Sequence, residues 1–258
     1  MRDRRKKNRG NKKYIGAHVS IQGGMWRAVG ACAEMGGNCF GLFLGSQRSW
    51  KRPPLDHTAA DKFREQCSLW EYDPAHVLPH GSYLMNCGSP KEDVFEKSQA
   101  LLVDELSRCS LLGLNLYNFH PGSSLGSITT EQCVEKIASA INRAHQQTPA
   151  VVTVLENMSG QGNTVGGKFS ELRSIIDKVR DQTRVGVCLD TCHAFAAGRL
   201  GCNLDRHEDI GKGHIGISAF RDIVNEPRLD NIPLVLETPG RPGFQYAEQI
   251  ELLYSLHE

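Results

Sequence analysis

Two residues with metal-binding side chains follow a short apolar run in the C-terminal half of the chain. Residues 185–189 form this uninterrupted run, Asp190 comes next, and His193 lies three residues further on. Such a run predicts a strand buried on both faces of a parallel sheet. A carboxylate and an imidazole at its end contribute little to packing but suit a divalent metal ion. One Asp in this place is equally a helix N-cap, so repetition of the pattern decides its meaning.

The pattern recurs where four other apolar runs end. The polar residues at these ends are His80, His120, Glu156 and Glu237. Only a closed ring of parallel strands brings so many strand ends to one centre, which is the top of a (β/α)₈ barrel, where the active sites of that fold lie. An open doubly wound sheet is the alternative, but no GxGxxG motif follows the first run. We therefore predict an α/β protein with a TIM-type barrel.

Strands and helices alternate at roughly the spacing of βα units, as a parallel sheet with helical crossovers requires. Strands are expected at residues 14–19, 39–44, 75–79, 114–119, 151–155, 185–189 and 232–236, and helices at 25–34, 56–70, 91–112, 131–145 and 169–180.

The number of expected strands is one short of a complete barrel. No buried strand is recognisable between Asp190 and residue 232, and residues 198–204 are too few and too rich in Gly for a helix and a strand. The barrel is therefore expected to lack its strand-7 region. The same interval contains Asp205 and His207, which are two residues apart and could hold a metal ion from a loop.

The composition is that of an ordinary globular protein, with 40% hydrophobic and 23% charged residues among 258. No apolar run approaches the roughly eighteen residues of a membrane span, and nothing resembles a secretory signal. The nine cysteines are odd in number and lack CxxC spacing. We expect reduced thiols in an intracellular compartment, with zinc bound to cysteine as the less favoured alternative.

The net charge of +1 conceals a basic N-terminal arm. Residues 1–13 hold eight Lys or Arg and one Asp, which leaves 22 basic and 28 acidic residues in the other 245. We expect residues 1–13 to be disordered and residues 14–258 to form one catalytic domain. The arm is typical of a nuclear import signal or of non-specific phosphate contact, and a solvated tail without a partner is the alternative. Nuclear location is expected; mitochondrion and cytoplasm are the alternatives.

The candidate ligands comprise four imidazoles and four carboxylates, a set that suits Zn²⁺ and, less selectively, Mn²⁺ or Fe²⁺. They are His80, His120, Glu156, Asp190, His193, Asp205, His207 and Glu237. Eight ligands exceed the needs of one tetrahedral ion, so we expect a cluster of two or three ions. Such clusters stabilise the attacking and the leaving oxygen of an in-line phosphoryl displacement.

Several motifs together closely resemble the endonuclease IV family of apurinic/apyrimidinic endonucleases. They are residues 13–20 (KYIGAHVS), 78–83 (LPHGSY), 118–123 (NFHPGS), 156–157 (EN), 190–198 (DTCHAFAAG), 205–207 (DRH) and 236–238 (LET). The resemblance implies a TIM barrel with three zinc ions that cleaves double-stranded DNA on the 5′ side of an abasic site, acting in DNA repair. We further expect a monomer that does not span a membrane.

The resemblance also implies a role for each site residue. His80 and His120 resemble ligands of one zinc, and Glu156, the catalytic position, bridges to a second ion that Asp190 and Glu237 also hold. The third ion is expected on His193, Asp205 and His207. Arg48 and Tyr83 match positions that enter the DNA minor groove; taken alone, they read as a solvated loop charge and a packing residue.

One departure from the family is the His-Leu-Asn-Asp segment that ends its seventh strand, which this chain lacks. About one βα unit is missing between Leu200 and Gly201. We therefore expect fewer than three zinc ions and impaired cleavage. The alternatives are a divalent-metal sugar isomerase of the xylose isomerase-like type and an inactive or unstable DNA-binding variant.

Overall fold

The structure is a computed structural model that describes residues 12–198 and 204–258. The chain divides into two compact units. Unit 1 consists of Met1–Leu42, Asp56–Leu78 and His207–Glu258, and unit 2 consists of Phe43–Leu55 and Pro79–Arg206. Each unit is a parallel sheet with helices, and β3 (Val77–His80) passes from the first unit into the second.

Unit 1 is built on three parallel strands with β1 in the middle. Strand β1 (Tyr14–His18) pairs with β2 (Cys39–Phe43) on one side and with β9 (Pro233–Leu236) on the other. Gly16 is required here, since a Cβ at this residue would collide with the carbonyl oxygen of Cys39. The helices of the unit are α2 (Trp26–Glu34), α3 (His57–Leu69), α8 (Gly216–Asn225) and α9 (Tyr246–Ser255), with single 3₁₀ turns at η1 (Pro74–His76) and η3 (Pro227–Leu229).

The start of β1 is tied down by a lysine that we had assigned to the basic arm. Lys13 is 1% exposed, its Nζ lies 2.7 Å from a carboxylate oxygen of Asp230, and it donates a hydrogen bond to the carbonyl oxygen of Glu226. The prediction of disorder is therefore wrong for Lys13, because a buried ammonium with these partners is a fixed structural group. Residues 1–11 lie outside the described part of the chain.

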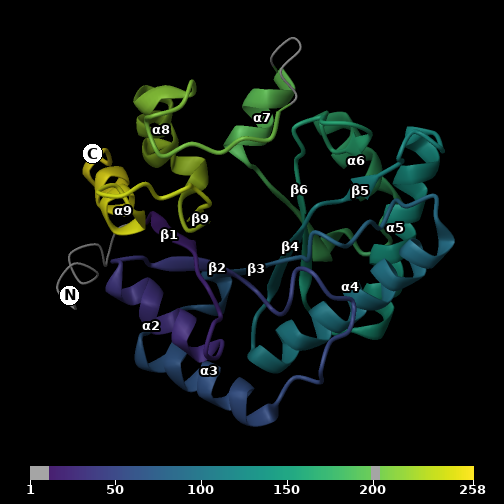
Figure 1. Ribbon diagram of the computed structural model, residues 1–258, viewed down its shortest axis with the longest axis horizontal. Coiled ribbons are helices and arrows are strands. Elements are labelled where there is room, and N and C mark those ends of the chain that lie inside the picture. Colours follow the sequence, from purple (N-terminus) through teal and green to yellow (C-terminus); the bar gives the residue numbers. More distant parts are fainter. Residues whose placement is uncertain (1–11, 199–203) are drawn as a thin grey trace. The chain divides into compact units, whose positions relative to one another are not determined.

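Unit 2 contains four parallel strands in the order β3-β4-β6-β8. The three that follow β3 are β4 (Leu116–Phe119), β6 (Val152–Glu156) and β8 (Val185–Cys188). Figure 1 shows helices α4 (Glu92–Leu112), α5 (Thr130–Gln147) and α6 (Phe169–Lys178) along one side of these strands. Helix α7 (Thr191–Gly198), the turn η2 (Gln182–Arg184) and a small antiparallel pair, β5 (Gly122–Ser123) with β7 (Thr164–Val165), complete the unit.

Local sequence explains why these helices form where they do. Helix α5 begins at a capping box in which Thr129 and Gln132 satisfy each other's backbone N–H groups. Its buried residues, among them Ile137 and Ile141, recur at helical spacing and face the sheet. Helix α4 ends at Gly113, whose φ of 73° is the left-handed conformation that glycine adopts most readily.

Strand β8 differs from the expected strand buried on both faces. Val187 is 49% exposed and Leu189, just beyond the strand, is 55% exposed. The physical reason is that β8 pairs only with β6 among the described residues of unit 2, so it is an edge strand. Over the described residues between β8 and β9 the chain forms helices and turns but no strand, as predicted. The expected position of the gap, between Leu200 and Gly201, lies outside the described residues.

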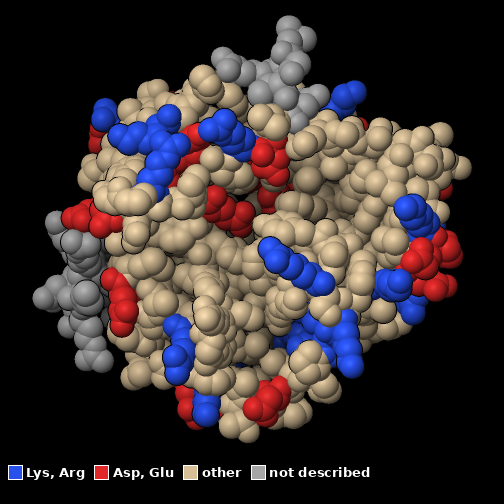
Figure 2. All heavy atoms as spheres, viewed as in Figure 1, with Lys and Arg blue, Asp and Glu red and all other residues tan. Residues whose placement is uncertain are grey.

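Charged residues of both signs are mixed on the surface, and the described cysteines are reduced, as the composition predicted. Figure 2 shows acidic and basic side chains next to one another on the surface. Among the ion pairs of unit 2 are Lys136 with Glu92 and Lys178 with Glu135. The eight cysteines in the described part of the chain are all free thiols. No helix in that part is both long and apolar enough to pass through a membrane.

Candidate metal centre

The carboxylate of Glu156, the last residue of β6, is surrounded by three imidazoles. Its Oε2 lies 3.1 Å from Nε2 of His80, and its Oε1 lies 3.6 Å from Nε2 of His120 and 3.3 Å from Nδ1 of His193. Asn118 donates a hydrogen bond of 2.5 Å to Oε2. The cluster forms because parallel strands end at the same edge, with His80 ending β3 and His120 following β4. These strand-end residues therefore lie together, as the sequence predicted.

The ring orientation of His80 indicates that a cation belongs between it and Glu156. Its Nδ1 lies 2.8 Å from the carbonyl oxygen of Gly81. A carbonyl oxygen only accepts, so Nδ1 carries the hydrogen and, in the neutral ring, Nε2 presents a lone pair to a carboxylate oxygen. Two lone pairs face each other only with a proton or a metal ion between them. A histidine held by a carbonyl through its other nitrogen is the usual arrangement in metal sites.

His193 repeats this arrangement from helix α7. Its Nδ1 lies 2.8 Å from the carbonyl oxygen of Asn157, and its Nε2 lies 3.3 Å from a carboxylate oxygen of Asp205. Asp190 accepts the backbone N–H of His193 at 2.7 Å and so begins α7 as an N-cap. Its carboxylate also lies 3.8 Å from Nδ1 of His193. Asp190 is therefore the N-cap of α7 and remains a candidate metal ligand, so the two interpretations of a strand-end Asp are compatible here.

The electrostatics of the cluster favour bound positive charge. Burial alone would raise the pKa of Glu156, but the imidazoles of His120, His193 and His80 outweigh it and hold the pKa well below its usual range. Burial would likewise lower the pKa of His193, but Asp205, Glu156 and Asp190 together raise it. His80, Glu156 and His193 are each no more than 3% exposed. Glu156 therefore stays ionised while the imidazole of His193 favours positive charge, and such a buried group is suited to a divalent cation.

The donor atoms of His80, His120 and Glu156 lie within 4.8 Å of one another, which is close enough for one ion to contact all three. His193, Asp190 and Asp205 adjoin them within unit 2. The other two predicted ligands, His207 and Glu237, belong to unit 1, where His207 opens its last segment and Glu237 directly follows β9. Within unit 2 the structure thus brings six of the candidates together.

The two predicted DNA-contact residues also belong to unit 2. Tyr83 is 59% exposed, and its ring centroid lies 5.6 Å from those of both His80 and His120. Its backbone N–H donates to the side-chain oxygen of Gln47 at 3.3 Å, which links it to the exposed loop that carries Arg48. Tyr83 thus presents an exposed aromatic ring beside the cluster, and the same ring packs edge-on against Phe43 at 5.4 Å.

Two asparagines of the site were not predicted. Asn118 is 3% exposed and holds Glu156, while Asn157 bonds both backbone groups of Asp190, accepting its N–H at 2.6 Å and donating to its carbonyl oxygen at 3.1 Å. The signal for both is a polar amide within or directly after a buried strand, where an apolar residue is the usual choice. Asn118 thereby orients Glu156, and Asn157 orients Asp190.

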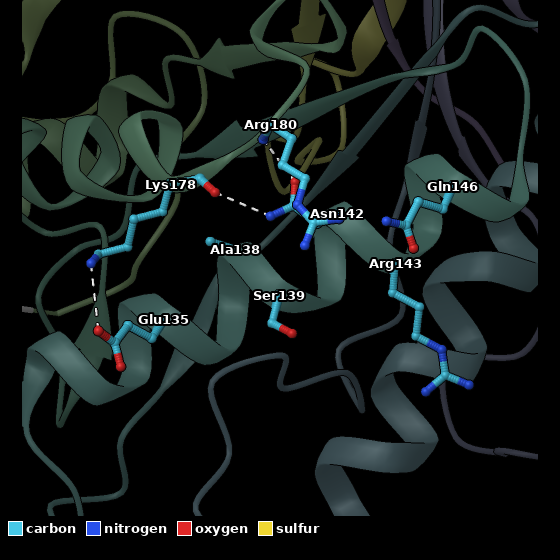
Figure 3. A pocket seen from close by; sticks show the side chains of 8 residues that line it. All are labelled: Glu135, Ala138, Ser139, Asn142, Arg143, Gln146, Lys178 and Arg180. Atoms are coloured by element: carbon cyan, nitrogen blue, oxygen red, sulfur yellow. Dashed lines mark hydrogen bonds and ion pairs between the residues drawn. The ribbon is translucent and has the colours of Figure 1, made fainter.

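A hollow of about 360 Å³ on the helical side of unit 2 lies away from this cluster, between α5 and the end of α6 (Figure 3). Asn142 donates to the carbonyl oxygen of Lys178 and accepts the N–H of Arg180, and Lys178 pairs with Glu135 at 3.5 Å. These polar groups join two helices, and the hollow carries no chemistry of the site.

The comparison with known proteins identifies the family. A family described as "Xylose isomerase-like TIM barrel" matches residues 29–256. A probable endonuclease 4 of Chlorobium phaeovibrioides is 43% identical over 279 aligned positions, which cover 95% of this chain and 99% of the relative. The chain belongs to the endonuclease IV family. An apurinic-apyrimidinic endonuclease 1 of Plasmodium berghei is 41% identical over 94% of this chain and 55% of that longer relative.

Solved structures agree with this assignment. Endonuclease IV of Thermus thermophilus superposes with a TM-score of 0.81 and 29% identity, covering 94% of this chain and 98% of the other. A D-psicose 3-epimerase of Clostridium cellulolyticum reaches a TM-score of 0.67 at 16% identity, covering 93% and 89%. The second likeness concerns the fold alone. The predicted TIM-type barrel and the predicted family are both confirmed.

The alignment also supports the missing βα unit. It extends over 279 positions, whereas the whole chain has 258 residues, so at least 21 positions of the Chlorobium relative face a gap in this chain. The described residues between β8 and β9 form no strand, which agrees with a gap in that interval. The chain is therefore a shortened member of its family.

Proposed function

We propose that this chain is a zinc-dependent DNA-repair endonuclease that hydrolyses the phosphodiester on the 5′ side of an abasic site in double-stranded DNA. The observation that carries the proposal is the buried carboxylate of Glu156 among His80, His120 and His193 at the edge where the strands end. The endonuclease names of relatives that are 41% and 43% identical support the reaction class.

Zinc fits the residues present. The donor set consists of imidazoles and carboxylates, and two imidazoles are held by carbonyl oxygens through one nitrogen while the other faces a carboxylate. His80, His120 and Glu156 would hold one ion, and Glu156, with Asp190, would share a second. His193 and Asp205 would hold a third from unit 2. Bound zinc supplies hydroxide at neutral pH and stabilises both the attacking and the leaving oxygen of the displacement.

The protein's own groups perform the remaining tasks. Glu156 keeps its negative charge because three imidazoles depress its pKa, so it opposes protonation at the centre of the site. Asn118 and Asn157 fix the carboxylates, and thereby hold the reacting geometry. Tyr83 is exposed beside the cluster and Arg48 is exposed in the neighbouring loop, and both would enter the minor groove to hold the abasic site open.

The shortened sheet limits the rate. An edge at β8 leaves α7, which carries His193, supported by one fewer strand than a closed ring provides. Misplacement of a catalytic group by about 1 Å costs on the order of 100-fold in rate. We therefore expect cleavage that is specific for abasic sites but much slower than that of a full-length relative, and fewer than three zinc ions per chain.

A nicking assay tests the proposal. A duplex with one abasic site, a matched intact duplex and an abasic single strand are incubated with the purified chain, with zinc and with a zinc chelator. Zinc-dependent cleavage on the 5′ side of the abasic site, leaving a 3′-hydroxyl, is the expected result. Isomerisation of an aldose to a ketose under the same conditions, without any cleavage, would instead show the isomerase alternative.

A further inference from the structure

Arg48 lies in a loop whose internal hydrogen bonds do not attach it to the rest of unit 2. The loop, residues 44–55, will be called the Arg48 loop. The N–H of Arg48 donates to Oγ of Ser46 at 3.2 Å, and Nε2 of Gln47 donates to the carbonyl oxygen of Gly45 at 3.2 Å. Such turns shape the tip, but a loop on the surface moves unless something fixes its ends.

One end of the Arg48 loop is fixed by a buried ion pair. The guanidinium of Arg52 contacts the carboxylate of Glu105 on α4, and the two side chains are 6% and 0% exposed. The same guanidinium lies directly beneath the other end, because a Cβ at Gly45 would collide with Nη1 of Arg52. Arg108, one turn along α4, adds a hydrogen bond of 2.6 Å to the carbonyl oxygen of Pro53. Arg52 thus lies against both ends of the Arg48 loop, and the loop is attached to the long helix α4.

The same buried group lies near the turn that carries Tyr83. Tyr117 is a fully buried residue of β4. Burial raises its pKa, the charge of Glu105 raises it further and the charge of Arg52 lowers it. Its hydroxyl oxygen would lie 2.9 Å from a Cβ at Gly81, which follows His80. At the surface, Gln47 accepts the N–H of Tyr83 at 3.3 Å. The Arg48 loop and the Tyr83 turn are therefore connected at the surface through Gln47.

Stability alone does not explain this ion pair. Apart from their mutual contact, the side-chain atoms of Arg52 and Glu105 have no hydrogen-bond partner among the residues that the structure describes. Replacing a buried ion pair with apolar residues of similar volume is often neutral or stabilising, because desolvation offsets the attraction. Apolar residues would not hold a planar guanidinium in one position against the backbone at Gly45, as the ion pair does for Arg52.

We propose that Arg52 and Glu105 are positioning residues, which anchor the Arg48 loop to α4 so that Arg48 and Tyr83 are presented to DNA as one rigid pair. This inference rests on the proposed role of Arg48 and Tyr83 in binding abasic DNA. It adds two buried residues, neither of which contacts DNA, to those on which damage recognition depends. Glycine at position 45 is part of the same anchor, since a larger residue displaces Arg52.

The anchor has a pH dependence that a purely apolar contact lacks. Burial raises the pKa of Glu105 to about 7; Arg52 opposes the rise, Asp104 adds to it and Arg108 opposes it. Cys109 of α4 and Tyr117 of β4 also face this group, and burial raises the pKa of each. As the pH falls through about 7, Glu105 gains a proton and the attraction for Arg52 is lost. The charge state of the anchor therefore changes between pH 8 and pH 6.

Hydrogen exchange of the loop amides is the direct test. Glu105→Gln and Arg52→Gln are compared with Asp93→Asn, which removes an exposed ion pair with Lys97 from the same helix. We expect exchange at residues 44–52 to be about tenfold faster in both Gln variants at pH 8 and unchanged in the control. The double variant Arg52→Met with Glu105→Met retains the apolar volume, so its melting temperature stays near that of the wild type while its loop exchanges rapidly. Between pH 8 and pH 6, loop protection corrected for intrinsic exchange changes in the wild type and stays constant in Glu105→Gln.

Binding to DNA gives the second measurement. The Gln variants are expected to bind an abasic duplex about tenfold more weakly than wild type, to bind an intact duplex equally well and to retain the wild-type zinc content, since the anchor lies outside the metal cluster. Loop exchange in Glu105→Gln and Arg52→Gln equal to that of Asp93→Asn overturns the anchor. Rapid loop exchange in a protein that binds abasic and intact duplexes alike leaves the anchor standing and refutes the proposed function instead.

Discussion

Glu156→Gln is the substitution that most directly tests the metal centre. It changes one oxygen to an amide nitrogen and removes the charge around which His80, His120 and His193 are arranged. Asn118, which donates to Oε2 at 2.5 Å, would then face either an amide oxygen or another donor. The substitution preserves volume, so its main effect is on cation affinity and not on packing.

The size of the effect follows from mass action. A cation present at 1,000 times its Kd stabilises the folded chain by about 4 kcal/mol, which corresponds to roughly 8–16 °C in Tm for a chain of this length. Removing a charged ligand from a group of three donors should weaken binding by about 100-fold or more, given that even the outer partners of ligands contribute 10- to 100-fold. That loss removes about 2.7 kcal/mol, or roughly 5–11 °C, of the zinc-dependent gain in Tm.

The assay compares melting temperatures with zinc and with chelator for wild type, Glu156→Gln and Glu135→Gln. Glu135 lies on α5 with its side chain 58% exposed and pairs with Lys178, so it provides the same chemical change away from the site. The difference between the two conditions isolates binding from any effect of the substitution on the metal-free fold. A Glu156→Gln variant that kept the wild-type zinc content and the full zinc-dependent rise in Tm would refute the assignment of Glu156 as a ligand.

Three further predictions concern the metal, the arm and the gap. Cleavage is expected to disappear on exhaustive chelation of zinc and not to return with Mg²⁺, which prefers oxygen ligands and water; full activity after chelation, measured by nicking, would contradict it. Deleting residues 2–11, which hold six of the eight basic residues of the arm and spare the buried Lys13, should weaken binding to intact and abasic duplexes alike. It should also flatten the slope of log Kd against log salt by up to about 5, whereas an unchanged slope would show that the arm does not touch phosphate. Inserting a helix–strand segment ending in His-Leu-Asn-Asp between Leu200 and Gly201 should raise the Tm, the zinc content and the cleavage rate together. Three zinc ions and family-like turnover in the chain without the insertion would show that the gap has no such effect.

The strands and the central ligands were predictable because both depend on local sequence and on one rule of topology. Apolar runs marked the seven main strands, and parallel strands end at the same edge, so His80, His120 and Glu156 had to meet. The N-cap role of Asp190 was also open to prediction, since Asp is common at helix starts.

Other features depend on tertiary pairing and could not be read locally. Lys13 was assigned to the basic arm because no residue near it in sequence predicts its ion pair with the distant Asp230. Glu105 reads as a solvent-facing residue of α4, and only the approach of Arg52 from a distant loop accounts for its burial. Val187 was expected to be buried because an apolar run does not reveal whether a second strand is present to cover it.

The exposed edge of β8 also affects the solubility of the protein. Along the side away from β6, its backbone N–H and C=O groups lack a paired strand among the described residues, and Val187 and Leu189 stand exposed beside them. An exposed apolar edge of this kind is a template for strands of other molecules, and natural proteins usually guard such edges with charges, bulges or Pro. β8 itself, with the sequence VGVC, has none of these. Solubility should therefore fall steeply with protein concentration, and a single lysine in place of Val187 should delay the onset of turbidity without altering the residues that surround Glu156.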